Sequence, residues 1–455
     1  MLKFFFLLKV SLISLLCIGC KQNNIATITK MEAHTDVDSF VYAMKEIHPN
    51  LFWECSEQVF NDSLDKIHER LVNAHYSPIE LYKHLQPLTT ILGDGHTQLY
   101  FPKEILQKED ILVFPLPIEV NTNDSTLWLK CDYYSNGVKL KKGIQLLSVN
   151  GTSYRTLVEE MLPYCSGERI FFRLSKVNRD FNHFLYMLYP SDSFSITYKT
   201  EKGLKECNID AVPYHKYTEL SIQQTAVNEP YEFEFIDNKT ALMTFNAFKD
   251  LDRFKLFVDS MFYQLHENKT EHLIIDLRNN GGGDSNIGDE LFQYISDNPF
   301  LQFGQFITRY SNMQKKLAKD NWGADYYNHS DGIDTVTYNT LIPLRNNPLR
   351  YNGKITLLIS HATFSSASAF AWTFKKLNRG PIVGEESGGM SVCFGDVVIY
   401  RLPHSKIAST ISFARVYLYG ANDTEPIHGV LPDIEIPQEK ALEFVLHNQI
   451  SQTYN

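Results

Sequence analysis

Hydrophobic and polar residues repeat with two different periods along this chain, and the helical period covers residues 30–90. Apolar side chains recur there every three to four positions, which is the spacing of one buried helix face. Asp36 and the Ser77-Pro78 pair are expected helix starts, because such residues cap or open a first turn. The apolar positions are Phe40, Val41, Met44, Ile47, Phe60, Leu64, Ile67, Leu71, Ile79, Leu81, Leu85 and Leu88. The pattern predicts an N-terminal helical domain over residues 30–109.

From residue 110 to residue 215 the period changes to two, which is typical of half-buried strands. Alternation is clear in residues 111–120 and 126–130, and a further strand ends at the Asn150-Gly151 turn, before a helix. Closing strands are predicted at Phe194–Thr200 and Lys205–Val212. These segments predict a small β domain over residues 110–215, inserted before the rest of the chain.

Residues 225–440 alternate between short apolar runs and helical patterns, which predicts an α/β layered domain. The predicted strands are Thr240–Phe245, Leu273–Leu277, Ile355–Ile359 and Ile382–Gly384. The predicted helices lie near Leu251–Leu265, Ile287–Ile295 and Ala367–Leu377. Residues 304–348 are poor in pattern, so we expect a long connection that serves as a lid or as surface packing.

The chain starts with an apolar stretch, residues 1–19, that is too short for a comfortable transmembrane helix. Lys3 and Lys9 flank and interrupt it, and Gly19-Cys20 before polar residues resembles a bacterial lipoprotein signal. An ordinary signal peptide is the alternative. We expect acylation of Cys20, a tether over residues 20–29, and a membrane-anchored lipoprotein of the cell envelope that faces the periplasm or the cell surface.

Composition and charge indicate which kinds of binding partner, nucleic acid or metal, this protein is not expected to have. The 455 residues are 44% hydrophobic and carry a formal net charge of −10, so we expect a filled core. No run of basic residues is long enough to bind the phosphate backbone of a nucleic acid, so nucleic acid is not an expected partner. Five of the seven cysteines follow Cys20 and none forms a CxxC pair, so we expect no zinc site; Cys165 and Cys207 are a candidate disulfide.

A run of small residues, Ser366-Ala367-Ser368-Ala369, follows the predicted strand Ile355–Ile359 and opens a predicted helix. Small residues at such a turn leave a hydroxyl exposed, and the helix N-terminus favours developing negative charge. Ser366 is therefore the candidate nucleophile, with a plain helix cap as the alternative.

A second apolar strand, Leu273–Leu277, runs into three consecutive glycines that end at Gly283. Glycine tolerates conformations that leave N–H groups facing a pocket, so Gly281 and Gly282 are candidates for one side of an oxyanion hole. A phosphate cradle or a plain turn are the alternatives. The loop has no Walker lysine and no GxGxxG spacing, which disfavours nucleotide binding.

Two further segments carry groups that a nucleophilic serine needs. His96 lies between a glycine and a threonine, where a neutral imidazole can act as a general base. Glu425 precedes a proline and is a candidate to orient the imidazolium. A surface histidine and a surface loop are the respective alternatives, and His361 and His428 are competing bases.

Together these segments resemble the C-terminal processing peptidase and tricorn-core family of serine peptidases. The matching motifs are DGHT at 94–97, DLRNNGGG at 276–283, SAS at 366–368 and GVLPDI at 429–434. Processing peptidases use a Ser–Lys dyad, but the corresponding stretch 384–392 contains no lysine, and Lys375 and Lys376 do not match the motif. The chain therefore resembles the tricorn-like Ser-His-Glu branch, although the serine that precedes the histidine in tricorn-type sites is here Gly95.

The resemblance implies a ClpP/crotonase-like core. The strand that ends at Asn150-Gly151 separately resembles a PDZ segment, so we expect residues 110–215 to form a PDZ-like domain, which takes a peptide or only shapes the cleft. The family resemblance also implies a serine peptidase in which Ser366 attacks a peptide bond, His96 is the base and Glu425 supports His96. Backbone N–H groups of Ala367 and of Gly281 or Gly282 would hold the oxyanion, with no metal or organic cofactor. Peptides or proteins are the expected substrates. A catalytically inert relative that binds peptides or hydrophobic ligands is the alternative.

Overall fold

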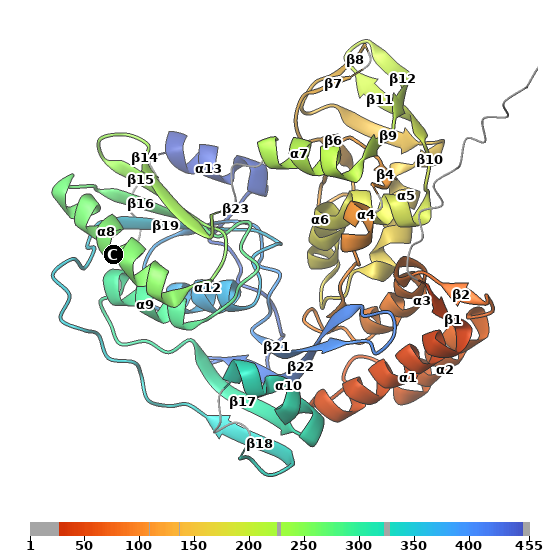
Figure 1. The fold of residues 1–455 in the computed structure, drawn as a ribbon. Coiled ribbons are helices and arrows are strands. Elements are labelled where there is room, and N and C mark those ends of the chain that lie inside the picture. Colours follow the sequence, from red (N-terminus) through yellow and green to blue (C-terminus); the bar gives the residue numbers. More distant parts are fainter. Residues whose placement is uncertain (1–26, 109, 136, 225–228, 323–327, 449–455) are drawn as a thin grey trace, which may run out of the picture.

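The computed structural model describes residues 27–448 apart from residues 109, 136, 225–228 and 323–327 (Figure 1). The expected signal segment and Cys20 lie outside the described residues, and the end of the expected tether, Ile28–Thr29, forms strand β1. Within the described part of the chain, no helix is both long and apolar enough to cross a membrane.

The N-terminal region contains three longer helices, as the apolar spacing predicts. They are α1 (Lys30–Ile47), α2 (Glu57–Arg70) and α3 (Pro78–Thr90), with β1 paired to β2 (His75–Tyr76) and followed by β3 (Gln98–Leu99) and α4 (Glu104–Lys108). Ser77 caps α3 and Pro78 opens it, as expected. The expected start at Asp36 is wrong, because Thr29 caps α1 and forms a capping box with Glu32. Asp36 is buried and accepts backbone N–H groups from residues 404 and 405.

The inserted region contains an antiparallel sheet in the order β12-β11-β9-β6-β5, as the alternating pattern predicts. The strands of the whole inserted region are β4 (Leu112–Val113), β5 (Ile118–Val120), β6 (Leu127–Leu129), β7 (Tyr133–Ser135), β8 (Val138–Leu140), β9 (Gln145–Val149), β10 (Thr152–Ser153), β11 (Ser193–Thr200), β12 (Gly203–Asp210) and β13 (Val212–Pro213). Its helices are α5 (Tyr154–Met161), the 3-10 turn η1 (Leu162–Tyr164), α6 (Ile170–Leu188) and α7 (Tyr214–Gln224). The candidate disulfide is wrong: Cys165 and Cys207 are both free thiols.

The C-terminal region is built on a six-stranded sheet in the order β14-β15-β16-β19-β20-β23, parallel except at β14. Its strands are β14 (Tyr231–Phe235), β15 (Thr240–Phe245), β16 (His272–Asp276), β19 (Lys354–Ile359), β20 (Ile382–Gly384) and β23 (Ile434–Glu435). One face packs on α8 (Leu251–Glu267), α9 (Asn286–Ile295) and α12 (Ser366–Lys376), and the other packs on α13 (Gln438–His447) (Figure 1). Strands β15, β16, β19 and β20 and the first three helices agree with the predicted segments to within about two residues, whereas β14 and β23 were not predicted.

A second antiparallel sheet, in the order β18-β17-β22-β21, joins this core to the N-terminal helices. Its strands are β17 (Phe303–Tyr310), β18 (Gly332–Thr337), β21 (Val392–Arg401) and β22 (Ala408–Leu418). The expectation of a patternless connection over residues 304–348 is wrong, because this segment contributes β17, α10 (Asn312–Trp322) and β18. The short strand β3 also pairs with β22, which brings a segment near residue 96 beside the C-terminal core.

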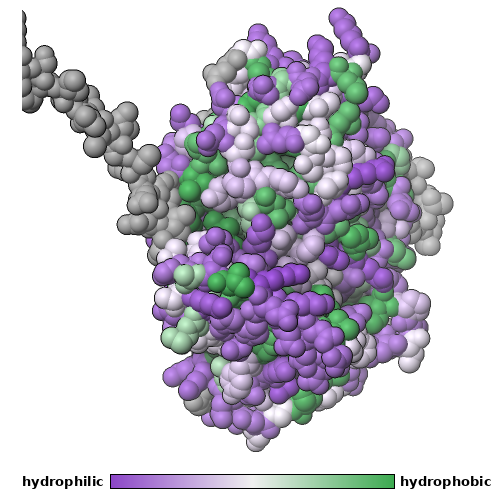
Figure 2. Space-filling view, turned by 90° about the vertical axis from the view of Figure 1, so that its right-hand side faces the viewer, coloured by the Kyte–Doolittle hydropathy of each residue, from purple (hydrophilic) through white to green (hydrophobic). Residues whose placement is uncertain are grey.

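The surface of the molecule is mostly hydrophilic on the face shown in Figure 2, where hydrophobic residues gather only in small groups. The apolar side chains instead fill three buried clusters, one shared by the N-terminal helices, the inserted region and the second antiparallel sheet, and one on each face of the parallel sheet. Burial of this kind removes apolar surface from water and dominates the stability of the fold.

Candidate active site

The turn between β19 and α12 presents a serine at the carboxyl end of the parallel sheet. Ser365 has φ 54° and ψ −128°, a conformation that costs a non-glycine residue free energy and that recurs where strain serves a site. The helix α12 starts at the next residue, so its first N–H groups lie directly beside the Ser365 side chain. This strand-turn-helix geometry is that of an exposed nucleophile on a sharp elbow.

A histidine from the N-terminal region reaches this serine. His96 Nε2 lies 3.0 Å from Ser365 Oγ, although the two residues are 269 positions apart. The His96 ring also packs on Phe364, with 4.3 Å between ring centroids. The distance is within hydrogen-bonding range for a nucleophile and its general base.

The backbone of His96 is fixed from two sides. Its N–H donates to Asp94 Oδ1 at 2.8 Å, and its carbonyl accepts the Thr410 hydroxyl of β22 at 2.7 Å. Asp94 is fully buried and also accepts the Ser412 hydroxyl at 2.7 Å, with His48 Nε2 at 3.3 Å. The pairing of β3 with β22 therefore determines where the imidazole stands.

The electrostatic environment keeps His96 neutral. Burial lowers the pKa of His96 to about 4, while the charge of Asp94 acts in the opposite direction. Burial alone would raise the pKa of Asp94, but the hydrogen bond and charge of His48 hold it below its usual range. At neutral pH the pair is thus a neutral imidazole beside an ionised carboxylate, and the imidazole is ready to accept a proton.

The structure does not bring the predicted nucleophile Ser366 to His96. Its hydroxyl donates to the Gly283 carbonyl at 2.6 Å and so links the start of α12 to the glycine loop. The reason is the left-handed turn at Ser365, which directs two neighbouring serine side chains to different sides. The geometry therefore moves the candidate nucleophile from Ser366 to Ser365.

The expected oxyanion donors are also displaced. The Ala367 N–H donates to the Phe364 carbonyl at 3.1 Å, and the Gly282 N–H donates to Asn280 Oδ1 at 2.8 Å, so both are already engaged. Gly281 is exposed, and its role stays a prediction. With Ser365 as the nucleophile, the adjacent N–H is that of Ser366 at the first position of α12.

Asn280 connects the glycine loop to the serine elbow. Its side-chain amide donates to the Phe245 carbonyl at 2.7 Å, and its own carbonyl accepts the Phe364 N–H at 3.0 Å. Gly282, with φ 95°, passes so close that a Cβ there would lie 2.7 Å from Ser365 Cβ. The second glycine is therefore required by close approach of two backbones.

Glu425 is not brought to His96. It is an exposed residue between β22 and β23, and its backbone N–H donates to Asn422 Oδ1 at 3.2 Å. Among the described residues, no hydrogen bond or ion pair joins its side chain to His96. The expectation that Glu425 orients His96 stays a prediction, and the geometry does not favour it.

The two competing histidine bases and the two candidate lysines also lie away from Ser365. His361 is buried against Thr122, with 2.8 Å between His361 Nδ1 and the hydroxyl, and His428 Nδ1 lies 2.5 Å from the Gly429 carbonyl. Lys375 Nζ bonds the Leu431 carbonyl and Asp433. Lys376 Nζ lies 5.1 Å from the centre of the Trp372 ring. Within the described part of the chain, no cluster of three or more His, Cys, Asp or Glu residues is placed to hold a metal ion.

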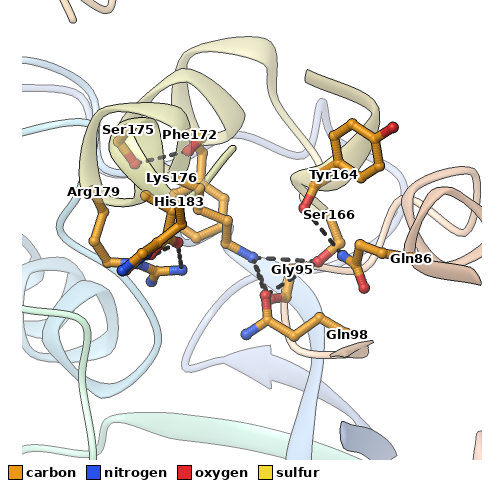
Figure 3. Close-up of polar contacts among 11 residues, drawn as sticks. Gln86, Gly95, Gln98, Tyr164, Ser166, Phe172, Ser175, Lys176, Arg179 and His183 are labelled. Carbon is orange, nitrogen blue, oxygen red and sulfur yellow. Dashed lines mark hydrogen bonds and ion pairs between the residues drawn. The ribbon is translucent and has the colours of Figure 1, made fainter. Parts of the chain in front are cut away.

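Helix α6 of the inserted region packs against the His96 loop, which sequence reasoning missed. Lys176 is buried, and its Nζ donates to the Gly95 carbonyl at 2.9 Å, to Gln98 Oε1 at 3.0 Å and to Ser166 Oγ at 3.3 Å (Figure 3). Phe172 stacks on Phe364 with 4.2 Å between centroids. The signal was available: Leu174, Val177, Phe181, Leu185 and Leu188 repeat at helical spacing.

The same helix covers the edge of β5, where an added peptide strand would pair. Asn178 Oδ1 accepts the Val120 N–H at 2.9 Å, and Asn182 Nδ2 donates to the carbonyls of Phe114 and Leu116 at 2.6 and 3.1 Å. The Gly143 N–H, in the turn before β9, is engaged as well, because it donates to the Leu129 carbonyl at 2.8 Å. These contacts favour the reading in which the inserted region shapes the cleft.

A neutral histidine hydrogen-bonded to a serine on a strand-to-helix elbow defines the class of serine hydrolases. Residues 239–436, which include the glycine loop and Ser365, match peptidase family S41. This region of the chain is therefore similar to the domain of peptidase family S41, a family of serine-type peptidases.

Solved structures support the fold of the whole chain. Mature CPAF is 15% identical with a TM-score of 0.64, over 90% of this chain and 94% of the CPAF chain. A CPAF mutant is 15% identical with a TM-score of 0.66, over 93% and 96% of the two chains. Mature CPAF in complex with lactacystin is 15% identical with a TM-score of 0.64, over 90% and 95%. At this identity the likeness concerns the fold, with its N-terminal helices, mixed α/β core and antiparallel sheets.

Proposed function

We propose that this protein hydrolyses peptide bonds through an acyl-enzyme formed on Ser365, with His96 as the general base. The observation that carries the proposal is the 3.0 Å approach of His96 Nε2 to Ser365 Oγ at a strained strand-to-helix elbow. The lowered pKa of His96 supports it, because the free imidazole is neutral and able to accept a proton at any pH above about 5.

The steps follow from the positions of these groups. Ser365 Oγ attacks the carbonyl carbon of the scissile bond while its proton passes to His96 Nε2. The carbonyl oxygen becomes an oxyanion beside the Ser366 N–H and the positive end of α12. His96 then gives the proton to the leaving amine, and a water activated by His96 hydrolyses the ester.

Peptides or proteins of the cell envelope are the proposed substrates, and Cys20 is the proposed site of the lipid that would anchor the protein to the membrane. The support is sequence-based: the Gly19-Cys20 pair follows a short apolar leader. Radioactive palmitate incorporation that Cys20→Ala abolishes would support this location, whereas labelling of the variant would contradict it.

Hydrolysis of a mixed peptide library by the full chain tests the activity. Ser365→Ala and His96→Ala are each expected to lower kcat by about 10³-fold or more. Full activity of either variant would overturn the dyad. If the wild-type chain binds library peptides without cutting them, the inert binding relative becomes the better account.

A further inference from the structure

A second ionisable group of the inserted region lies beside the His96 loop, and the mechanism above does not use it. Both carboxylate oxygens of Glu168 are buried and lack a hydrogen bond of good geometry among the described residues, although the backbone N–H groups of Gly95 and of Glu168 itself stand near enough to favour the charged form. His96 Nδ1, the ring nitrogen that faces away from Ser365, likewise lacks a hydrogen bond of good geometry, although the Phe394 carbonyl stands near enough to favour the protonated ring. Buried polar atoms are almost always paired in native proteins, so two such groups at one site call for a functional explanation.

The position of Gly95 shows how close the carboxylate comes to the base. A Cβ on Gly95 would lie 2.9 Å from Glu168 Oε2, and it would also meet ring atoms of Phe364 and Phe172 at 2.8 and 2.9 Å. The Glu168 carboxylate therefore occupies the space that any side chain at position 95 would need. It stands against the residue that directly precedes His96.

Two oppositely charged groups of the inserted region thus hold one glycine between them. Lys176 Nζ donates to the Gly95 carbonyl, while the Glu168 carboxylate faces the Gly95 Cα (Figure 3 shows the lysine side). Glu168 lies just before α6 and Lys176 lies on its second turn, so one short segment supplies both groups. Lys176 donates to Gly95, Gln98 and Ser166, which leaves the Glu168 oxygens without a direct bond from Lys176.

The charge of Asp94 also favours the protonated His96 ring, but the oxygens of Asp94 are engaged in other hydrogen bonds. Its two oxygens already accept the His96 N–H and the Ser412 hydroxyl, and Oδ2 also faces His48. When His96 accepts the serine proton, a positive charge appears on a buried ring, which is costly unless a negative group stands near it. The uncommitted negative group at this place is Glu168.

The geometry points to Glu168 as a positioning residue for the proposed Ser365–His96 dyad, whose carboxylate stabilises the protonated form of His96 from across Gly95. This inference rests on the proposed function and assigns to Glu168 the supporting role first expected of Glu425. It makes catalysis depend on the docking of α6, because the charge that favours the imidazolium comes from the inserted region.

The ionisation of Glu168 gives the inference a pH signature. Burial, followed by the charge of Asp94, raises the pKa of Glu168 to about 7, and Lys176 acts in the opposite direction. Cys393 of β21 is a further titratable group near this carboxyl, and burial raises the pKa of its thiol well above the usual range, so it stays neutral. As pH rises through 7, Glu168 gains its charge, and kcat is expected to rise with it.

The experiment compares Glu168→Gln and Glu168→Asp with the wild-type full chain on one cleavable peptide between pH 5 and pH 9. The matched control is Glu385→Gln, because Glu385, directly after β20, is also buried and contacts Asn123 of the inserted region, but its oxygen without a hydrogen bond lies 3.7 Å from His361 Nδ1. We expect Glu168→Gln to lower kcat roughly 10- to 100-fold at pH 8, to lose the rise near pH 7 and to keep KM within about twofold. Glu168→Asp should retain the rise, and Glu385→Gln should match the wild type.

A Glu168→Gln chain with wild-type kcat and an unchanged rise near pH 7 would overturn the inference. If that variant does not fold, Glu168→Asp decides, and loss of the pH-dependent rise in it would overturn the inference equally. Ser365→Ala and His96→Ala in the same assay distinguish failure of the proposed dyad from failure of the role of Glu168. Activity in these two variants would refute the dyad itself. Their inactivity beside a normal Glu168→Gln refutes only the role of Glu168.

Discussion

The close approach of the glycine loop to the serine elbow makes Gly282→Ala the most revealing single substitution. An added Cβ would lie 2.7 Å from Ser365 Cβ, 2.9 Å from the Phe364 carbonyl oxygen and 2.9 Å from the Ser366 nitrogen. Carbon atoms in contact normally stand about 3.5–4.0 Å apart, so the elbow or the loop must shift by roughly 1 Å. Asn280 bonds to both segments, so neither can move alone.

Two costs follow from this geometry. A left-handed backbone costs an alanine about 1–2 kcal/mol, and overpacking adds about 1–3 kcal/mol, so we expect a loss of roughly 2–5 kcal/mol in the free energy of unfolding. A displacement of about 1 Å at the nucleophile can lower the rate about 10²-fold. Urea unfolding and kcat for a cleavable peptide measure the two effects separately.

Gly151→Ala is the matched control, because Gly151 has φ 77° but no atom within 4 Å of the added Cβ. It should show the backbone cost of about 1–2 kcal/mol without loss of kcat. Gly282→Ala with wild-type kcat and a stability equal to that of Gly151→Ala would refute the close-approach argument.

Two further predictions concern the groups around the dyad. Because folding lowers the pKa of Asp94 below its ordinary value of 3.8, its ionised form stabilises the protein above about pH 4, and this contribution is lost as pH falls further. Asp94→Asn should therefore lose roughly 2–4 kcal/mol at pH 7 and less at pH 3 in urea unfolding, and an equal loss at both values would contradict the assignment. Lys375→Ala/Lys376→Ala should keep kcat within about twofold in the peptide assay, since Lys375 bonds Leu431 and Asp433, and inactivity of this variant would revive a Ser–Lys mechanism.

The local pattern of apolar residues was sufficient to predict the central strands of the parallel sheet and the helices on one of its faces. Strands β15, β19 and β20 each hold runs of apolar residues between turns, and α8 and α12 carry clear helical spacing. Such segments are buried by their immediate neighbours, so the spacing of their apolar residues indicates their secondary structure directly.

The second sheet could not be predicted in the same way. Strand β17 pairs with β22 more than a hundred residues later, and β22 contains serine and threonine residues that are buried because of what packs on them. Its hydrogen bonds are long-range, so no short window of sequence shows them. The same sheet places His96, which explains why the motif around residue 96 indicated a base without showing what holds it.

The choice between Ser365 and Ser366 depends on one backbone torsion. The motif matched at positions 366–368 drew attention to the second serine, while the positive φ at position 365 directs the first one to His96. Residue types alone do not reveal that torsion. Glu168 was equally hidden, because it lies 72 positions from His96 and meets its loop only when α6 docks.

Mapping the serine that reacts with a fluorophosphonate is the most direct test of the central claim. The full chain is labelled, digested and analysed by mass spectrometry, alongside Ser365→Ala and Ser366→Ala. We predict an adduct on Ser365, no labelling of Ser365→Ala, and labelling of Ser366→Ala with a moderate loss of stability from its lost bond to Gly283. An adduct on Ser366, or undiminished labelling of Ser365→Ala, would contradict the account.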